Sequence, residues 1–169
     1  ITPLDEQLHP PSADPSWQES YYFNWSTADG ATFGLTRIGF NPSTRTADAL
    51  LIIVDEGRVS HVYPSVGTSM TPGEMTERAE RGLTVGNLTF TMREPLTRWH
   101  IRLTGRVEVD LTFTALAPPH DYPMPEASPD PQQDSRTSDA HHFEQTGRVH
   151  GWVSTGGHRR DIDALGQRD

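Results

Sequence analysis

Trp17-Gln18-Glu19-Ser20-Tyr21-Tyr22-Phe23-Asn24-Trp25 is the stretch that decides the fold class of this chain. Rings and one carboxylate occupy its odd positions, and mainly polar residues occupy its even positions. Because successive side chains of a strand point to opposite faces, an alternation with a period of two predicts a β-strand. Since several rings seldom face water together, we expect Glu19 to face the core together with Trp17, Tyr21, Phe23 and Trp25.

The same kind of pattern continues towards the C-terminus in short segments that are separated by Gly, Pro, Asn and Asp. Residues 107–115 alternate most cleanly, and only residues 71–80 suggest a short helix, with Thr71 as its N-cap. We predict about nine strands in an antiparallel sandwich or barrel. The strands are expected at residues 17–25, 33–40, 49–54, 59–63, 83–92, 99–103, 107–115, 144–154 and 159–165.

One domain accounts for the length of 169 residues. Residues 1–16 are rich in Pro and Asp and predict an extended arm, whereas residues 17–169 form the β domain. Residues 118–138 carry no periodicity and predict a long mobile loop within that domain.

Composition excludes several classes of protein. The absence of cysteine rules out disulfides, thiolate metal sites and a cysteine nucleophile. The 23 acidic residues outnumber the 14 basic ones, and this balance argues against nucleic acid as a partner. No run of 18 apolar residues occurs and no signal peptide precedes Ile1, so we expect a cytoplasmic protein without a membrane span.

Four blocks of sequence, in this order, resemble a family of bacterial proteins. They are residues 14–24, residues 36–42, residues 142–147 and residues 166–169. The family is built from two lipocalin-like halves and is related to the carotenoid 1,2-hydratase (hydroxyneurosporene synthase) group. The resemblance implies that this chain is the N-terminal half of a bilobal protein, because the last block of the family leads into a second half.

The resemblance also implies a barrel that binds an isoprenoid-like or lipid-like molecule. Enzymes of this kind protonate an alkene without a cofactor, as hydratases or cyclases, and an isomerase is a third possibility. The other possibilities are a non-catalytic lipid carrier and a structural half that packs on a partner, which would be the missing C-terminal half or a second copy. We expect no cofactor, and expect Trp17, Tyr21, Phe23, Trp25, Trp99 and Arg37 to surround the ligand.

Glu19 is the first candidate for acid–base chemistry. A carboxyl group among rings has a raised pKa and could protonate an alkene, while the rings would stabilise a carbocation. The alternative is a structural carboxylate in the core that pairs with an arginine, for which Arg37 on the next strand is the expected partner.

His100 and Asp110 are the second candidate. They lie on two consecutive predicted strands, which usually pair, so the two side chains could approach each other as an acid–base pair. The alternative is a solvated face with cross-strand charge pairs.

A metal site is not expected, although His142, Glu144 and His150 share one predicted strand face. Their spacing matches no known ligand signature, and a third ligand with fixed geometry is missing. Glu144 and Gln145 belong to a family-like block, which favours structural hydrogen bonds for both of them.

Overall fold

A computed structural model describes residues 1–11, 13, 15–69, 82–122 and 143–169 of the chain. In this part the structure contains one short 3-10 helix, η1 (Pro3–Glu6), and eleven strands, all of which pair antiparallel. The strands are β1 (Glu19–Thr27), β2 (Thr32–Asn41), β3 (Thr46–Asp55), β4 (Arg58–Ser69), β5 (Leu83–Val85), β6 (Leu88–Glu94), β7 (Arg98–Leu103), β8 (Val107–Ala115), β9 (His120–Asp121), β10 (Phe143–Thr155) and β11 (His158–Arg168).

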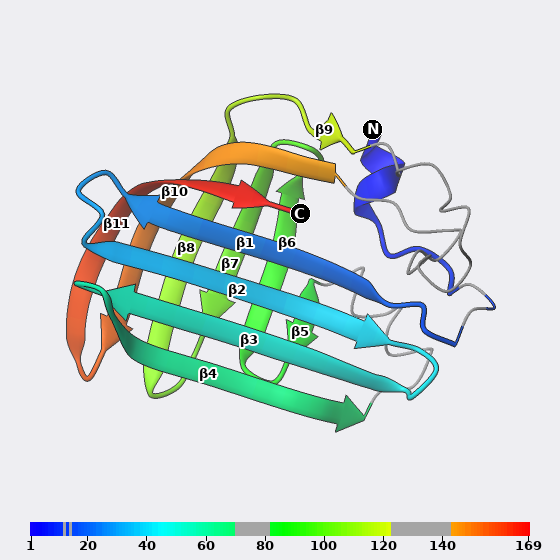
Figure 1. Ribbon diagram of the computed structural model, residues 1–169, viewed down its shortest axis with the longest axis horizontal. Coiled ribbons are helices and arrows are strands. Elements are labelled where there is room, and N and C mark those ends of the chain that lie inside the picture. The colour runs from blue at the N-terminus through cyan, green and yellow to red at the C-terminus, as the bar shows by residue number, and fades with distance from the viewer. Residues whose placement is uncertain (12, 14, 70–81, 123–142) are drawn as a thin grey trace, which may run out of the picture.

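The strands form one sheet in the order β4-β3-β2-β1-β11-β10-β8-β7-β6-β5, with β9 added beside β10. The sheet bends so that β1–β4 form a front layer over β5–β8, as Figure 1 shows. The two ends of the strand order, β4 and β5, lie close together. A hydrogen bond links them, in which the backbone N–H of Asn87, in the β5–β6 turn, donates to the hydroxyl of Tyr63 in β4 at 2.8 Å. The result is a nearly closed antiparallel barrel, as the sequence predicted.

The interior of the barrel is filled by the inward-facing side chains of both layers. Phe23 lies at the centre, and its ring centroid is 5.1 Å from Phe90, 5.6 Å from Phe113 and 5.9 Å from Trp99. These edge-to-face and tilted contacts are the geometries that aromatic rings prefer. The rings of the predicted inward stripe therefore form part of a packed aromatic core.

Most strand predictions are confirmed, and β8 has the predicted bounds. The prediction of a single strand over residues 83–92 is wrong, because Gly86 adopts a φ of +59° and turns the chain between β5 and β6. That hairpin and the short β9, inside the predicted loop, raise the count from nine to eleven strands. The predicted helix at 71–80 and the rest of the loop, from residue 123, lie outside the described residues.

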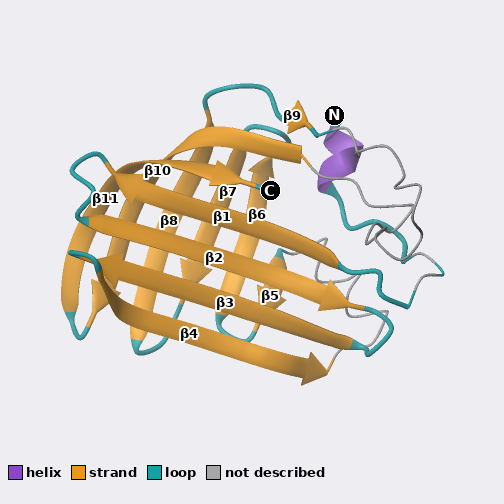
Figure 2. Ribbon diagram, viewed as in Figure 1, coloured by secondary structure: helices purple, strands orange, loops and turns teal. Residues whose placement is uncertain are grey.

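The two ends of the barrel differ in what closes them. Helix η1 packs at one end, and the β1–β2, β3–β4 and β10–β11 turns lie at the other, as Figure 2 shows. Helical structure in the described residues is limited to the four residues of η1, which are too few to span a bilayer.

Candidate functional site

A buried polar network occupies the η1 end of the barrel. Glu6, from η1, and Arg168, from the end of β11, are each only 2% exposed and form an ion pair. Glu6 also accepts hydrogen bonds from the Trp99 indole at 3.1 Å and from the backbone N–H of Leu96. Burial lowers the pKa of the Arg168 guanidinium, and the adjacent Glu6 carboxylate opposes that shift.

Gln145 completes this network from β10. Its side-chain oxygen accepts from Arg168 Nε at 2.7 Å, and its side-chain nitrogen donates to the carbonyls of Leu96 and Ala117 at 2.9 and 2.7 Å. One amide thus connects β10, β11 and the segments that flank β7 and β8. The structural hydrogen-bond role predicted for Gln145 is confirmed.

Glu19 opens β1 at the same end of the barrel. Its side chain is 16% exposed and lies 3.2 Å from His9 Nδ1, and it also accepts from the backbone N–H of His9 at 3.3 Å. Burial raises the pKa of the Glu19 carboxyl group, and the contacts with His9 partly oppose that effect. Glu19 is therefore a shielded carboxyl group that faces inward with Tyr21, as its position in the stripe predicted.

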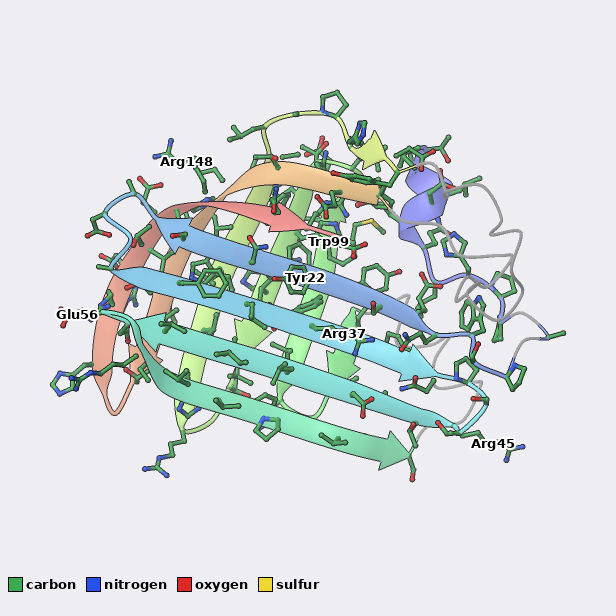
Figure 3. The ribbon with its side chains drawn as sticks, viewed as in Figure 1. Tyr22, Arg37, Arg45, Glu56, Trp99 and Arg148 are labelled. Carbon is green, nitrogen blue, oxygen red and sulfur yellow. The ribbon has the colours of Figure 1, made fainter. Side chains whose placement is uncertain are left out.

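The expected pairing of Glu19 with Arg37 is wrong. Arg37 lies opposite Tyr22 in the β1–β2 register, on the outer face of the sheet, whereas Glu19 lies opposite the buried Phe40. The Arg37 guanidinium contacts Gln18 at 3.4 Å, and Figure 3 shows Arg37 and Tyr22 on the same front layer. Among the described residues the buried arginine is Arg168, not Arg37.

Four of the five other residues expected around a ligand face inward, and they are Tyr21, Phe23, Trp25 and Trp99. Phe23, Trp25 and Trp99 are each at most 2% exposed, and Tyr21 is buried with its ring 5.5 Å from Trp99. The Tyr21 hydroxyl donates to the Glu6 carbonyl at 3.1 Å, and burial raises its pKa. The Trp17 side chain is half-buried, just before β1 begins.

His100 and Asp110 do meet, as the pairing of consecutive strands suggested. His100 Nε2 lies 2.9 Å from Asp110 Oδ1, and Arg93 approaches His100 Nδ1 at 3.4 Å. The pair lies on the outer face of β7 and β8, whose register places Arg102 opposite Asp110. Glu19 faces the interior, so the structure does not bring the three predicted acid–base residues together.

A pocket of about 210 Å³ lies at the other end of the barrel, beside the β3–β4 and β10–β11 turns. The buried side chains of Ile53, Val153 and Ile162 form its apolar floor. Polar and charged side chains complete its lining, and they are Thr32, Asp55, Thr155, His158, Arg159 and Arg160.

The rim of this pocket is organised by Arg160. Its Nη1 donates to Asp55 at 2.6 Å and to the Thr32 hydroxyl at 2.7 Å, which links β11 to β2 and β3. The neighbouring Arg159 lies over the Trp152 ring at 4.5 Å. The pocket thus combines an apolar floor with a rim in which cations outnumber acids.

No group of three metal-ligating side chains is found among the described residues. Glu144 and His150 lie on β10, and His142 falls outside the residues that the structure describes.

Sequence reasoning missed Glu6, Arg168 and the pocket. Glu6 sits in a Pro- and Asp-rich arm with no strand pattern, so its burial left no periodic signal. Arg168 and Gln145 lie within the two short C-terminal blocks that carried the family resemblance. Membership of those blocks was the one sequence feature that could have pointed to these two residues. The pocket residues come from four different strands, which only the register brings together.

Comparison with known proteins finds one matching sequence family and a similar solved structure. The family described as "Domain of unknown function (DUF7064)" matches residues 2–169. A crystal structure of a candidate AttH protein from Nitrosomonas europaea is similar, with a TM-score of 0.55 and 15% sequence identity over 89% of this chain. The match covers 49% of that protein, so the chain spans about half its length. The fold is lipocalin-like, and no curated protein matches the sequence.

Proposed function

The chain belongs to the DUF7064 family, and we propose that it is a domain that binds a small lipid-like or isoprenoid-like molecule. The proposal places the ligand in the pocket at the end of the barrel opposite η1. The apolar end of the ligand would lie on Ile53, Val153 and Ile162, and its polar head would face Arg160.

The observation that carries the proposal is the combination, in one cavity, of buried apolar side chains with an arginine that Asp55 and Thr32 hold in place. Ligand sites are concave and mainly apolar, with a few polar groups that fix the orientation of the ligand. Arg160 is held by Asp55 and Thr32, so its guanidinium is oriented before a ligand arrives. A carboxylate on the ligand could share that arginine through a charge-assisted hydrogen bond.

The size of the pocket limits the ligand. Its volume of about 210 Å³ is below the roughly 300–1,000 Å³ of sites for drug-sized molecules. The pocket therefore suits a short molecule, or the end of a longer one whose remainder lies outside. This limit favours a short-chain carboxylate or a single isoprenoid unit over a fully enclosed long-chain lipid.

An alternative version of the proposal places catalysis at the η1 end of the barrel, opposite the pocket, with Glu19 as the acid. The resemblance to the carotenoid hydratase group suggests an acid that protonates an alkene, and Glu19 has the raised pKa and the aromatic surroundings for that role. His100 and Asp110 lie on the outer face, so they would serve a separate site or a structural role. In this version Glu19→Gln abolishes turnover, whereas His100→Asn leaves it unchanged.

Titration calorimetry with octanoate and octanol tests the binding site. We expect octanoate to bind in a one-to-one complex and Val153→Phe, which fills the pocket, to weaken binding at least tenfold. Val109→Phe is the matched control, because Val109 is also buried and lies opposite Val153 but does not line the pocket. Arg160→Met is expected to weaken octanoate binding and to leave octanol binding unchanged.

Two results would contradict the site. One is the absence of binding by both compounds to the unaltered chain. The other is octanoate binding that Val153→Phe leaves intact while the variant remains folded by circular dichroism.

A further inference from the structure

The carboxylate of Glu6 lies in a binding site that the barrel supplies. It accepts hydrogen bonds from the Trp99 indole at 3.1 Å and from the backbone N–H of Leu96, and it pairs with Arg168. A guanidinium and two N–H donors directed at one carboxylate form a strong anion site, because charge-assisted hydrogen bonds are stronger than neutral ones. We call Leu96, Trp99 and Arg168 together the carboxylate site.

The three donors of the carboxylate site are held in place by the barrel itself. The Gln145 side chain accepts from Arg168 Nε at 2.7 Å and donates to the Leu96 carbonyl at 2.9 Å. The Trp99 ring is packed in the core, and its centroid is 5.9 Å from that of Phe23. The site therefore owes its geometry to β7, β10 and β11 and not to the segment that carries its occupant.

The backbone of Leu96 is strained in the conformation that serves this site. Its φ of +56° lies in the left-handed region, which favours glycine. Because the N–H of Thr97 donates to the Glu94 carbonyl at 3.1 Å, Leu96 is the third residue of a turn in which Pro95 is the second. A positive φ at that position is typical of a type II turn and normally calls for glycine. Strain of this kind is frequent at ligand clamps, and here it accompanies an N–H donated to a carboxylate.

The segment that carries Glu6 is held to the barrel by few other contacts. Glu6 is the one buried residue among residues 1–10, all of which the structure describes, and Leu4 is 70% exposed. None of the described residues before β1 pairs with a strand of the sheet. Leu8 packs partly on the core, and His9 contacts Glu19. The Glu6 carboxylate is thus the main attachment of this segment.

We propose that the carboxylate site is a second ligand site, in which a free aliphatic carboxylate of the size of propionate replaces Glu6. Propionate has the two carbons and the carboxylate group of the Glu6 side chain, so it fits the space that this side chain leaves. Arg168 is buried, and a buried cation without a counter-charge is strongly destabilising. Glu6 therefore leaves the site when another carboxylate takes its place, and the exchange releases η1 from the end of the barrel.

The tether of Glu6 sets the concentration at which a free carboxylate competes. Glu6 is connected to β1 through residues 7–18, and a short flexible linker gives its binding group an effective concentration on the order of millimolar. Propionate is therefore expected to compete in the millimolar range or above. No tethered carboxylate of this kind opposes octanoate at Arg160, so octanoate is expected to fill the pocket at the other end at lower concentrations.

A spin label on the N-terminal segment of the full chain tests the exchange. The chain has no cysteine and Leu4 is exposed, so Leu4→Cys accepts a single nitroxide. At constant ionic strength we expect propionate to raise the mobility of this label in a saturable way, and uncharged propionamide to leave it unchanged. A label at Leu116→Cys, where Leu116 is 61% exposed, is the matched control. A Leu4→Cys label that propionate does not mobilise, or that propionamide mobilises equally, would overturn the proposal.

A second measurement empties the site. We expect propionate to raise the urea midpoint of Glu6→Ala and to have no such effect on Glu19→Ala, which removes a carboxylate at the same end of the barrel but outside the site. The effect should persist when Glu6→Ala is combined with Arg160→Met. Equal shifts in the two alanine variants, or loss of the effect with Arg160→Met, would contradict a site at Arg168. The label experiment retains Glu6, so it holds even if Glu6→Ala does not fold.

Discussion

Glu6 and Arg168, from opposite ends of the sequence, form an ion pair inside the barrel, and both residues are 2% exposed. Glu6 comes from η1 and Arg168 from the end of β11, so the pair joins the N-terminal segment to the last strand. The contact closes the η1 end of the barrel and fixes the strands around it.

Loss of one charge of this pair should destabilise the fold strongly. Glu6→Gln leaves the Arg168 guanidinium buried without a counter-charge, and we expect a loss of about 3–5 kcal/mol in the free energy of unfolding. Urea denaturation measures this difference. Glu6→Gln combined with Arg168→Met removes both charges and should recover most of the loss. A change below about 1 kcal/mol in the single variant would contradict the role of the pair.

A side chain at Gly34 is expected to destabilise the fold, because it would collide with the Trp25 ring. A Cβ atom at Gly34 would lie 2.0 Å from the nearest Trp25 ring atom, in the fully buried core. We expect Gly34→Ala to cost about 1–3 kcal/mol in thermal or urea unfolding, as overpacked cores do. In the Trp25→Leu background the same change should cost much less, and strict additivity of the two changes would refute the contact.

Trp25 itself offers a separate test. Its indole nitrogen is buried and has no hydrogen-bond partner in the described part of the structure. Trp25→Phe therefore removes a buried donor at the same time as it reduces ring volume. We expect a smaller loss of stability than for Trp99→Phe, since the Trp99 indole donates to Glu6. The urea midpoints of the two variants provide the comparison. A loss of stability for Trp25→Phe that equals or exceeds the loss for Trp99→Phe would contradict this expectation.

Glu19 should make stability depend on pH in a defined direction. Because burial raises its pKa above 4.5 in the folded chain, the folded state binds the proton more tightly than the unfolded state. This contribution is complete below pH 4.5 and is lost as the pH rises through the folded-state pKa. We expect Glu19→Gln to flatten the stability profile in that window, as measured by urea unfolding at stepped pH. Glu108→Gln, on the outer face, serves as the matched control.

This experiment also separates the two roles considered for Glu19. Among the described residues no arginine pairs with Glu19, so Glu19→Gln leaves none of the described arginines buried without a counter-charge. A large loss of stability at neutral pH would show that the contact with His9 is essential to the fold. A small change would leave Glu19 available as an acid.

The His100–Asp110 pair should contribute little to stability. The two side chains are 20% and 43% exposed, and exposed ion pairs are worth about 0–1 kcal/mol. We expect Asp110→Asn to change the free energy of unfolding by less than about 1 kcal/mol and to leave octanoate binding intact. A loss of octanoate binding would instead indicate coupling between the outer face and the pocket.

The sequence predicted the fold class because period-two alternation directly reports a half-buried strand. It gave β8 the bounds that the structure shows, and it placed Glu19 on the inward face with Tyr21 and Phe23. It failed between β5 and β6, where Gly86 and Asn87 turn the chain within a stretch of alternating apolar and polar residues. The Gly86-Asn87 pair between two alternating runs is itself a hairpin signal, and that signal was overlooked.

The candidate site was less accessible from the sequence. Arg37 was the nearest arginine along the chain, but alternation places it on the face opposite Glu19. The true buried pair joins Glu6 to Arg168, and such a contact depends on barrel closure. The pocket likewise depends on register, since Arg160 reaches Asp55 and Thr32 only after β11, β2 and β3 are assembled.

The most direct test of the proposed function is an NMR titration of the ¹⁵N-labelled chain with octanoate. We predict saturable shifts that cluster on the amides of Ile53, Val153 and Ile162 and on the side chain of Arg160, with the amides near Glu6 and Glu19 unmoved. Shifts confined to the surroundings of Glu19, or no saturable shifts at all, would contradict the assignment of the pocket as the binding site.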